Sequence, residues 1–250
     1  PQITDGEGVE LPRKAHSVAF VDVSFSYSDQ ELLQGINFRL EPGESLGLLG
    51  RTGSGKTTLT RLLFRLYDPQ KGKIELDGVD VRQLTLKTLR KRVGLVTQDV
   101  QLFRGTVREN LTFFDPGITD EKIYEALELL GLRRWVEKLP QGLDTPLHGE
   151  GGGLSAGEAQ LLTFARIFLQ DPGVVVLDEP SSRLDPATEK LLTHAMDRLF
   201  QGRTAIVIAH RLETIERVDK VMVLAGGKIA EFGKREELAR DPRSLYRSML

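Results

Sequence analysis

The pattern of apolar and polar residues first predicts a strand-rich region in the N-terminal part of the chain. Between residues 18 and 27 the side chains alternate between two faces, one carrying Phe20 and the other Val21. This two-residue period is typical of a β-strand with one buried face. Further strands are predicted at residues 33–40, 45–50, 71–78 and 93–97, and a helix at residues 57–67.

After about residue 98 the pattern becomes helical, and then strands and helices alternate. Apolar runs rich in β-branched residues, set between helices, are typical of a parallel sheet that is covered on both faces. We therefore predict an α/β fold with a parallel core, an antiparallel β lobe and a helical insertion at about residues 99–165. The helices are predicted at residues 120–139, 155–169, 186–200 and 212–218, and the strands at 173–180, 204–210 and 220–229.

The composition excludes several classes of protein and several kinds of active site. Of the 250 residues, 40% are apolar and 28% are charged, which is typical of a globular protein. The net charge of -2 lacks the basic excess of a nucleic-acid-binding domain. The absence of cysteine excludes disulfides, Cys-based zinc sites and thiol catalysis. No apolar run approaches the roughly 20 residues that a membrane-spanning helix needs.

Residues 1–17 are predicted to be a linker. They are polar, contain prolines and glycines, and lack the apolar core of a secretory signal. The chain does not begin with Met, so we expect it to be a fragment of a longer polypeptide. Residues 18–250 are then expected to form the folded domain.

Residues 50–57, with the sequence GRTGSGKT, match the phosphate-binding pattern G-x-x-x-x-G-K-[ST]. An apolar strand precedes the motif and a helix follows it, the context in which such a loop points its N–H groups at phosphate oxygens. Lys56 is then expected to reach the β- and γ-phosphates, and Thr57 to place its hydroxyl on Mg2+. The alternative is a glycine-rich turn without a ligand, and the agreement of strand, loop and helix argues against it.

Two acidic residues follow a second buried strand, VVVL at residues 174–177. Ligands bind at the carboxyl ends of the strands of open parallel sheets. Asp178 can therefore hold Mg2+ through water, and Glu179 can polarise an attacking water as a general base. Alternatively the pair is the acidic start of a helix, since Pro180 follows. The phosphate loop favours the catalytic interpretation.

Three further residues lie at the end of a predicted strand or directly after one, and each carries a weak signal on its own. Tyr27 either packs on its strand or stacks on an adenine ring. Gln98 can offer a side-chain oxygen to Mg2+, and His210 is either structural or functional. Whether these three residues are functional can be judged only together with the other motifs of the chain.

Taken in chain order, these motifs resemble those of an ABC transporter nucleotide-binding domain. The order is the phosphate loop, Gln98, LSAGEAQ at residues 154–160, VVVLDEP at 174–180, SSRLD at 181–185 and His210. The resemblance covers residues 18–250, and the segments GTVRENLTF (105–113) and HGEGGG (148–153) are similar to exporter-type domains. It implies a P-loop NTPase fold with a RecA-like core and a helical subdomain that carries the family signature. It also implies that two domains sandwich two ATP molecules head to tail.

The resemblance further implies a role for each matching residue. Tyr27 would stack on adenine, Glu179 would be the catalytic base, and His210 would be the switch histidine near the γ-phosphate. Asp185 would lie at the dimer interface. The residues implied to bind ATP are Tyr27, Gly50, Arg51, Thr52, Gly53, Ser54, Gly55, Lys56, Thr57, Thr58, Gln98 and Asp178. Those implied to hold Mg2+ are Thr57, Gln98 and Asp178.

The chain departs from the family pattern at its signature. Where the family has L-S-G-G-Q, residues 154–158 read LSAGE. Ala156 adds a Cβ where close backbone approach is needed, and Glu158 places a carboxylate near a phosphate. This departure is similar to that of heterodimeric exporters with one competent and one degenerate site. The residues implied to face the partner's ATP are Ser155, Ala156, Gly157 and Glu158.

We therefore predict the ATP-hydrolysing motor domain of a heterodimeric multidrug exporter, using ATP and Mg2+ at the cytoplasmic face of a membrane. The expected partners are a second, non-identical ABC subunit and the chain's own membrane domain, and no nucleic acid is expected. Two alternatives stay open: a soluble ABC ATPase of repair or translation, and a nucleotide-sensing module that dimerises with little turnover. The altered signature favours the sensing module, whereas Glu179 argues against it.

Overall fold

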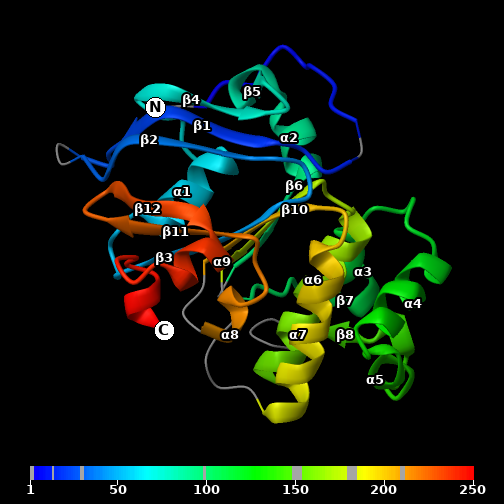
Figure 1. The fold of residues 1–250 in the computed structure, drawn as a ribbon. Helices are drawn as coiled ribbons and strands as arrows, with labels where there is room; N and C mark the ends of the chain where they lie inside the picture. Colours follow the sequence, from blue (N-terminus) through cyan, green and yellow to red (C-terminus); the bar gives the residue numbers. More distant parts are fainter. Residues whose placement is uncertain are drawn as a thin grey trace. The chain divides into compact units, whose positions relative to one another are not determined.

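The computed structural model consists of two units, and Figure 1 labels most of their helices and strands. The core unit consists of Pro1–Leu95, Pro172–Glu179 and Phe200–Leu250, and the helical unit of Val96–Asp171 and Pro180–Leu199. The structure describes residues 3–12, 14–28, 31–97, 100–147, 154–178, 185–208 and 212–250.

The core unit contains a largely parallel sheet with the strand order β12-β11-β3-β10-β9-β6. Strand β10 pairs in parallel with both β9 and β3, and β11 pairs in parallel with β3. The side chains of residues 174–177 in β9 are fully buried, which is why this run is apolar throughout. The strands are β3 (Ser45–Gly50), β6 (Val93–Val96), β9 (Val174–Asp178), β10 (Thr204–Ile208), β11 (Lys220–Ala225) and β12 (Lys228–Lys234).

A four-stranded antiparallel sheet, with the order β2-β1-β4-β5, forms the β lobe of the core unit. The strict alternation predicted for β1 is wrong, because Asp22 adopts a left-handed φ of 50° and the register shifts around it. As a result Val21 is 37% exposed, whereas Val23, which the alternation puts on the same face, is fully buried. The strands are β1 (Val18–Phe25), β2 (Leu33–Leu40), β4 (Lys71–Leu76) and β5 (Val79–Asp80).

Two predicted elements of the core unit end earlier than their sequence patterns suggest. The helix predicted at residues 57–67 stops at Leu63, because Arg65 takes a φ of 52° and buries its side chain. The single strand predicted at residues 220–229 is a hairpin, because Gly226 and Gly227 turn the chain between β11 and β12. The helices of this unit are α1 (Lys56–Leu63), α2 (Leu86–Arg92), α8 (Leu212–Ile215) and α9 (Arg235–Arg240), with 3-10 turns at Val81–Gln83 and Arg247–Met249.

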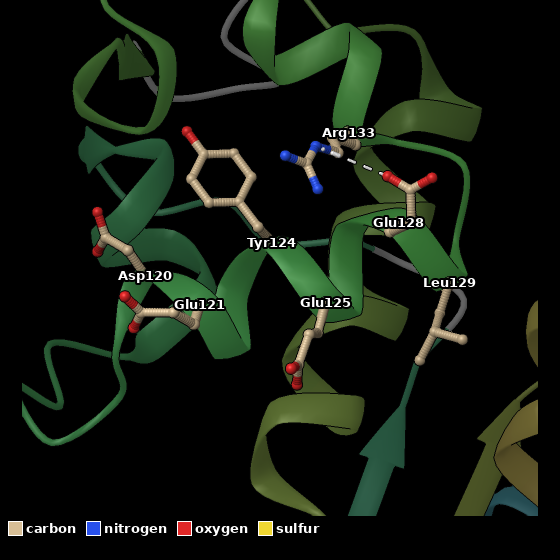
Figure 2. A pocket seen from close by; sticks show the side chains of 7 residues that line it. All are labelled: Asp120, Glu121, Tyr124, Glu125, Glu128, Leu129 and Arg133. Carbon is tan, nitrogen blue, oxygen red and sulfur yellow. Dashed lines mark ion pairs between the residues drawn. The ribbon is translucent and has the colours of Figure 1, made fainter.

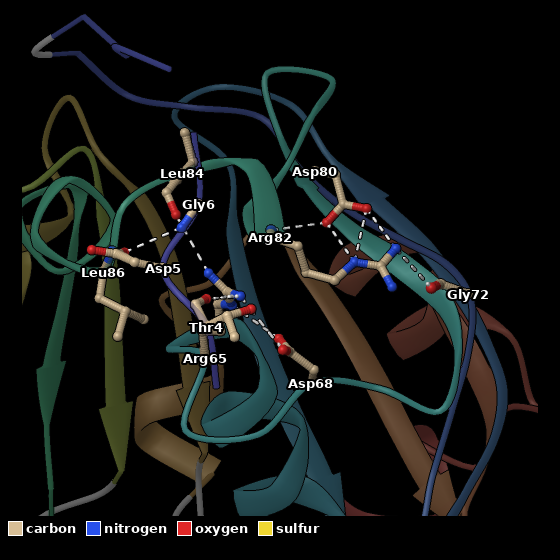
Figure 3. A network of polar contacts seen from close by, with 10 residues as sticks. All are labelled: Thr4, Asp5, Gly6, Arg65, Asp68, Gly72, Asp80, Arg82, Leu84 and Leu86. Carbon is tan, nitrogen blue, oxygen red and sulfur yellow. Dashed lines mark hydrogen bonds and ion pairs between the residues drawn. The ribbon is translucent and has the colours of Figure 1, made fainter. Parts of the chain in front are cut away.

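Residues 3–12 lie against the core unit and are held by polar contacts (Figure 3). Arg65, just beyond α1, donates from Nη2 to the carbonyl oxygen of Thr4 at 2.8 Å. The carboxylate of Asp5 accepts from the backbone N–H of Leu86 at 2.6 Å, at the first turn of α2. The side chain of Leu11 is 5% exposed and belongs to the core cluster. We call this segment the N-terminal strap.

The helical unit contains the longest helices of the described chain. The helix predicted at residues 120–139 is divided in two by Gly131, whose φ is 69°, whereas those predicted at 155–169 and 186–200 are present. The helices are α3 (Val107–Thr112), α4 (Asp120–Leu129), α5 (Arg133–Glu137), α6 (Ala156–Gln170) and α7 (Pro186–Phe200). A two-residue ladder joins β7 (Gly105–Thr106) to β8 (Pro146–Leu147), and a 3-10 turn spans Gly142–Asp144.

Arg166 on α6 is a buried cation that holds the segment before α3. Its guanidinium donates to the carbonyl oxygen of Gln101 at 2.8 Å and to the side-chain oxygen of Asn110 at 2.8 Å. The same group lies over the rings of Phe103 and Phe113, 5.4 and 5.0 Å from their centroids. Burial lowers the pKa of Arg166 to about 10, still well above neutral pH, so the guanidinium stays charged.

The predicted fold class is confirmed: a parallel α/β core, an antiparallel β lobe and a helical unit are all present. Within the described residues, no helix combines the length and the apolar character that crossing a bilayer requires.

Candidate functional site

The loop between β3 and α1 can form only with glycine at two of its positions. Gly50 has a φ of 145°, and a Cβ there would lie 2.4 Å from the carbonyl oxygen of Leu224. Gly55 has a φ of 105°, and a Cβ there would lie 2.5 Å from a methyl group of Leu33. The backbone of Leu224 and the side chain of Leu33 therefore leave room only for glycine at these two positions, and this lets the loop curve tightly.

Lys56 begins α1, and its ammonium group is folded over the loop. The side chain is 6% exposed, and Nζ donates to the carbonyl oxygens of Gly50 at 2.6 Å and Arg51 at 3.1 Å. Burial lowers the pKa of Lys56, while the carboxylate of Asp178 acts in the opposite direction. The ammonium is thus a poorly solvated cation, which would gain from contact with an anion.

The hydroxyl of Ser54 is buried in the same loop and has no hydrogen-bond partner among the described residues. Leaving such a group unpaired costs about 1–3 kcal/mol, so it marks a place where a polar ligand would be accommodated. Apart from Gly53 and its two chain neighbours, no atom of the described residues lies within 4 Å of the place that a Cβ at Gly53 would take. Helix α1 has no side-chain cap and no acidic residue in its first turn, so its N-terminus also favours an anion. These features fit a polyphosphate.

Two oxygen-bearing side chains near the loop fit a divalent cation. Thr57 is exposed on the first turn of α1. Asp178 ends β9, and its charge acts on Lys56. Hydroxyl and carboxylate oxygens are the ligands that Mg2+ prefers. Three predicted site residues, Gln98, Glu179 and His210, lie outside the residues that the structure describes.

Tyr27 stands beside the first turn of α1. Its hydroxyl oxygen lies 3.3 Å from the hydroxyl of Thr58, and the residue is 48% exposed. Edge-on contacts to Phe25 and Tyr67, with centroids 4.9 and 5.1 Å away, support the ring. The structure therefore brings the aromatic residue predicted from the strand end to the phosphate loop, 31 positions further along the chain.

The signature residues begin α6 in the helical unit, where they form a capping box. The hydroxyl of Ser155 accepts from the N–H of Glu158 at 3.2 Å, and the Glu158 carboxylate accepts from the N–H of Ser155 at 2.9 Å. Ala156 is exposed and Gly157 is buried. The carboxylate of Glu158 is thus turned back onto its own helix end. The S-x-x-E spacing could have predicted this arrangement.

Asp185 also acts as a helix cap. Its carboxylate accepts from the N–H groups of Ala187 at 3.1 Å and Thr188 at 3.0 Å, and from the Thr188 hydroxyl. The bond from the Thr188 hydroxyl is the main reason that the pKa of Asp185 is lowered. In the structure this side chain therefore begins α7.

A pocket of about 770 Å3 lies on α4 and α5 and contains none of the predicted site residues (Figure 2). The guanidinium of Arg133 lies over the ring of Tyr124, 5.3 Å from its centroid, and 3.7 Å from the carboxylate of Glu128. The pocket is lined by Asp120, Glu121, Tyr124, Glu125, Glu128, Leu129 and Arg133.

Comparisons with known proteins agree with this geometry. Residues 33–182 match the family model described as ABC transporter. An uncharacterized ABC transporter ATP-binding protein of Bacillus subtilis is 42% identical over 93% of this chain and 39% of its own length. The ATP-dependent lipid A-core flippase of Desulfotalea psychrophila is 41% identical over 96% of this chain and 42% of its own.

A solved structure of a bacterial Atm1-family ABC exporter with ATP bound is 36% identical, with a TM-score of 0.86. The match covers 97% of this chain and 44% of the exporter chain, so this chain spans less than half of each of these relatives. The family match covers 150 of the 250 residues, more than half of the chain, and includes the loop around Lys56. The chain therefore belongs to the ABC transporter family and is an ATP-binding, ATP-hydrolysing domain of the exporter type.

Proposed function

We propose that this chain is the motor domain of a heterodimeric ABC exporter and that its ATP hydrolysis drives export of a substrate across a membrane. The observation that carries the proposal is the phosphate loop. There, a buried Ser54 hydroxyl that no described residue pairs with and a poorly solvated Lys56 ammonium lie on a glycine turn. Such a loop binds the triphosphate, and the exporter-type relatives give the domain its context.

The chemistry assigned to the site is positioning and charge stabilisation around the γ-phosphate. Lys56 binds the β- and γ-phosphates as a point charge. Glu179 accepts a proton from the attacking water, and His210 stabilises the γ-phosphate. Tyr27 stacks on adenine. The remaining phosphate contacts come from Gly50, Arg51, Thr52, Gly53, Ser54, Gly55, Thr57 and Thr58.

The same site is proposed to use Mg2+. Thr57, Gln98 and Asp178 would hold it, because their oxygen atoms match its preference for hard ligands. When bound, Mg2+ neutralises charge on the β- and γ-phosphate oxygens.

The start of α6 supports an asymmetric pair of sites. The Glu158 carboxylate occupies the N–H of Ser155 and places a negative charge at the helix N-terminus, where a phosphate would otherwise be attracted. Ala156 adds a side chain at the same place. This half-site is therefore a poor receptor for the partner's ATP, whereas the phosphate loop of this chain is complete. A non-identical second ABC subunit with an intact signature completes the active site, head to tail.

The membrane partner is proposed from the relatives. They are more than twice as long as this chain, and one of them is named as a flippase. We place the chain at the cytoplasmic face of a membrane, joined to its own transmembrane domain. The exported substrate is then selected by that domain.

The purified two-chain complex tests the proposal. Glu179→Gln keeps the shape of the side chain and removes the base, so ATP hydrolysis should fall by roughly 10²–10⁴. Ser155→Ala alters the already impaired half-site, so hydrolysis should stay within about twofold of the unmodified complex. If Ser155→Ala reduces turnover as strongly as Glu179→Gln, both sites hydrolyse ATP and the asymmetric assignment is wrong.

The altered signature also favours a second candidate, a nucleotide-sensing module that dimerises with little turnover. Steady-state hydrolysis with and without the partner chain separates the two functions. A motor domain is stimulated by its partner, whereas a sensing module binds ATP in both conditions and releases almost no phosphate.

A further inference from the structure

Arg61 lies one turn after Thr58 on α1 and reaches the ring that stands beside the phosphate loop. Its Nη1 atom donates to the hydroxyl oxygen of Tyr27 at 3.4 Å. The same oxygen lies 3.3 Å from the hydroxyl of Thr58. Tyr27 is thus joined to two successive turns of the helix that begins with Lys56.

The direction of these hydrogen bonds follows from the chemistry of the groups. An arginine side chain has donors only, so the oxygen of Tyr27 must accept from Arg61. The phenolic proton is then available for the hydroxyl of Thr58. The hydrogen bond with Tyr27 is also the main reason that the pKa of Arg61 is raised. The resulting chain runs from Arg61 through Tyr27 to Thr58 and gives the ring one orientation.

The ring of Tyr27 depends on such side-chain contacts for its orientation. Tyr27 lies two residues beyond the end of β1 at Phe25, outside the strand pairs that the described residues form. Tyr67, itself 38% exposed, contacts it edge-on, and Phe25 supports it from β1. The two edge-on contacts support the body of the ring, and Arg61 and Thr58 fix its polar end.

We propose that Arg61 is a positioning residue for the Tyr27 ring and thereby a determinant of nucleotide-base affinity. This inference rests on the proposed role of Tyr27 in stacking on adenine. Arg61 acts through the tyrosine hydroxyl and not through its charge on the phosphates, which Lys56 neutralises. Loss of Arg61 therefore weakens the binding of ligands that carry a base and leaves unchanged the binding of ligands that consist of phosphates alone.

Binding of ATP and of inorganic tripolyphosphate, titrated with the whole polypeptide that carries this chain, tests the inference. Arg61→Ala keeps a strong helix former at this position. It should weaken ATP binding about three- to tenfold and change tripolyphosphate binding by less than about twofold. Arg61→Lys, which keeps a donor, should recover part of the loss. Equal weakening of both ligands, or no weakening of ATP, would overturn the proposal.

A double-mutant cycle separates action through Tyr27 from a general structural effect. Tyr27→Phe removes only the hydroxyl. The double variant that combines Arg61→Ala with Tyr27→Phe should therefore bind ATP no more weakly than either single variant does. Additive losses contradict the proposal. Arg39→Ala, which removes an exposed arginine paired with Glu41 on the β2 side of the same unit, is the matched control and should leave both ligands unaffected.

Two further variants distinguish failure of this inference from failure of the proposed function. Lys56→Ala should weaken both ATP and tripolyphosphate, and Tyr27→Ala should weaken ATP alone. If Tyr27→Ala leaves ATP binding unchanged, the stacking role itself is wrong. If Tyr27→Ala weakens ATP and Arg61→Ala does not, only the role of Arg61 is wrong.

Discussion

Two polar side chains of the phosphate loop, those of Lys56 and Ser54, are buried away from water. The Lys56 ammonium is almost completely buried, and two backbone carbonyls are its hydrogen-bond acceptors. Burial lowers its pKa although the carboxylate of Asp178 opposes the shift. Ser54 adds a buried hydroxyl that has no hydrogen-bond partner in the described part of the chain. We expect phosphate oxygens to give both groups a better partner, so that relief of this unfavourable arrangement contributes to binding.

At this scale Lys56→Ala should weaken ATP binding at least tenfold, which corresponds to about 1.4 kcal/mol. The cause is loss of a point charge on the β- and γ-phosphates. A nucleotide titration measures the effect. Lys73→Ala, which removes an exposed lysine that pairs with Glu75, is the control and should bind ATP normally. Unchanged affinity in Lys56→Ala would contradict the phosphate-loop assignment.

At the scale of elements, several helix starts are fixed by side chains from other parts of the chain or from the helix itself. The capping box of Ser155 and Glu158 is local to α6. Helix α2, in contrast, receives one cap from Thr85 and a second from Asp5 of the N-terminal strap, 81 positions away. The strap therefore contributes to a helix of the core unit, and it also contacts Arg65 at the end of α1.

Asp5→Ala should lower the free energy of unfolding by about 0.5–1 kcal/mol, because the N–H of Leu86 loses its acceptor. For a chain of this length that corresponds to a fall of roughly 1–4 °C in Tm. Asp5→Asn keeps the acceptor oxygen and is the matched control, with a smaller effect. Thermal unfolding that is identical for the alanine variant and the unmodified chain would show that the strap contributes no stability.

For the whole molecule, the proposed asymmetry has a consequence for nucleotide occupancy. With the base removed by Glu179→Gln, ATP binds and is not consumed. The two-chain complex should then retain about one ATP more per complex after rapid desalting than the unmodified complex does. Loss of the bound ATP at the same rate in both complexes would show that this chain does not supply the catalytic base of the assembly.

The order of the elements and the phosphate loop could be predicted because their information is contiguous in the chain. The pattern at residues 50–57 specifies its own glycine conformations, and the apolar runs in β9 and β10 specify buried strands. The phosphate-binding chemistry of the loop could also be predicted, because its hydrogen-bond donors come from residues that follow one another in the chain.

The tertiary structure decided what depends on residues far apart in the chain. The bulge at Asp22, the early end of α1 at Arg65 and the contact between Tyr27 and Arg61 each depend on neighbours brought together by folding. Local propensity and periodicity do not encode these neighbours, because many distant partners satisfy the same pattern. By itself the sequence determined the family, the fold class and the phosphate loop. Only packing decided how Tyr27 is oriented beside that loop and which distant side chains hold it, because those contacts exist only when the end of β1, α1 and Tyr67 are brought together.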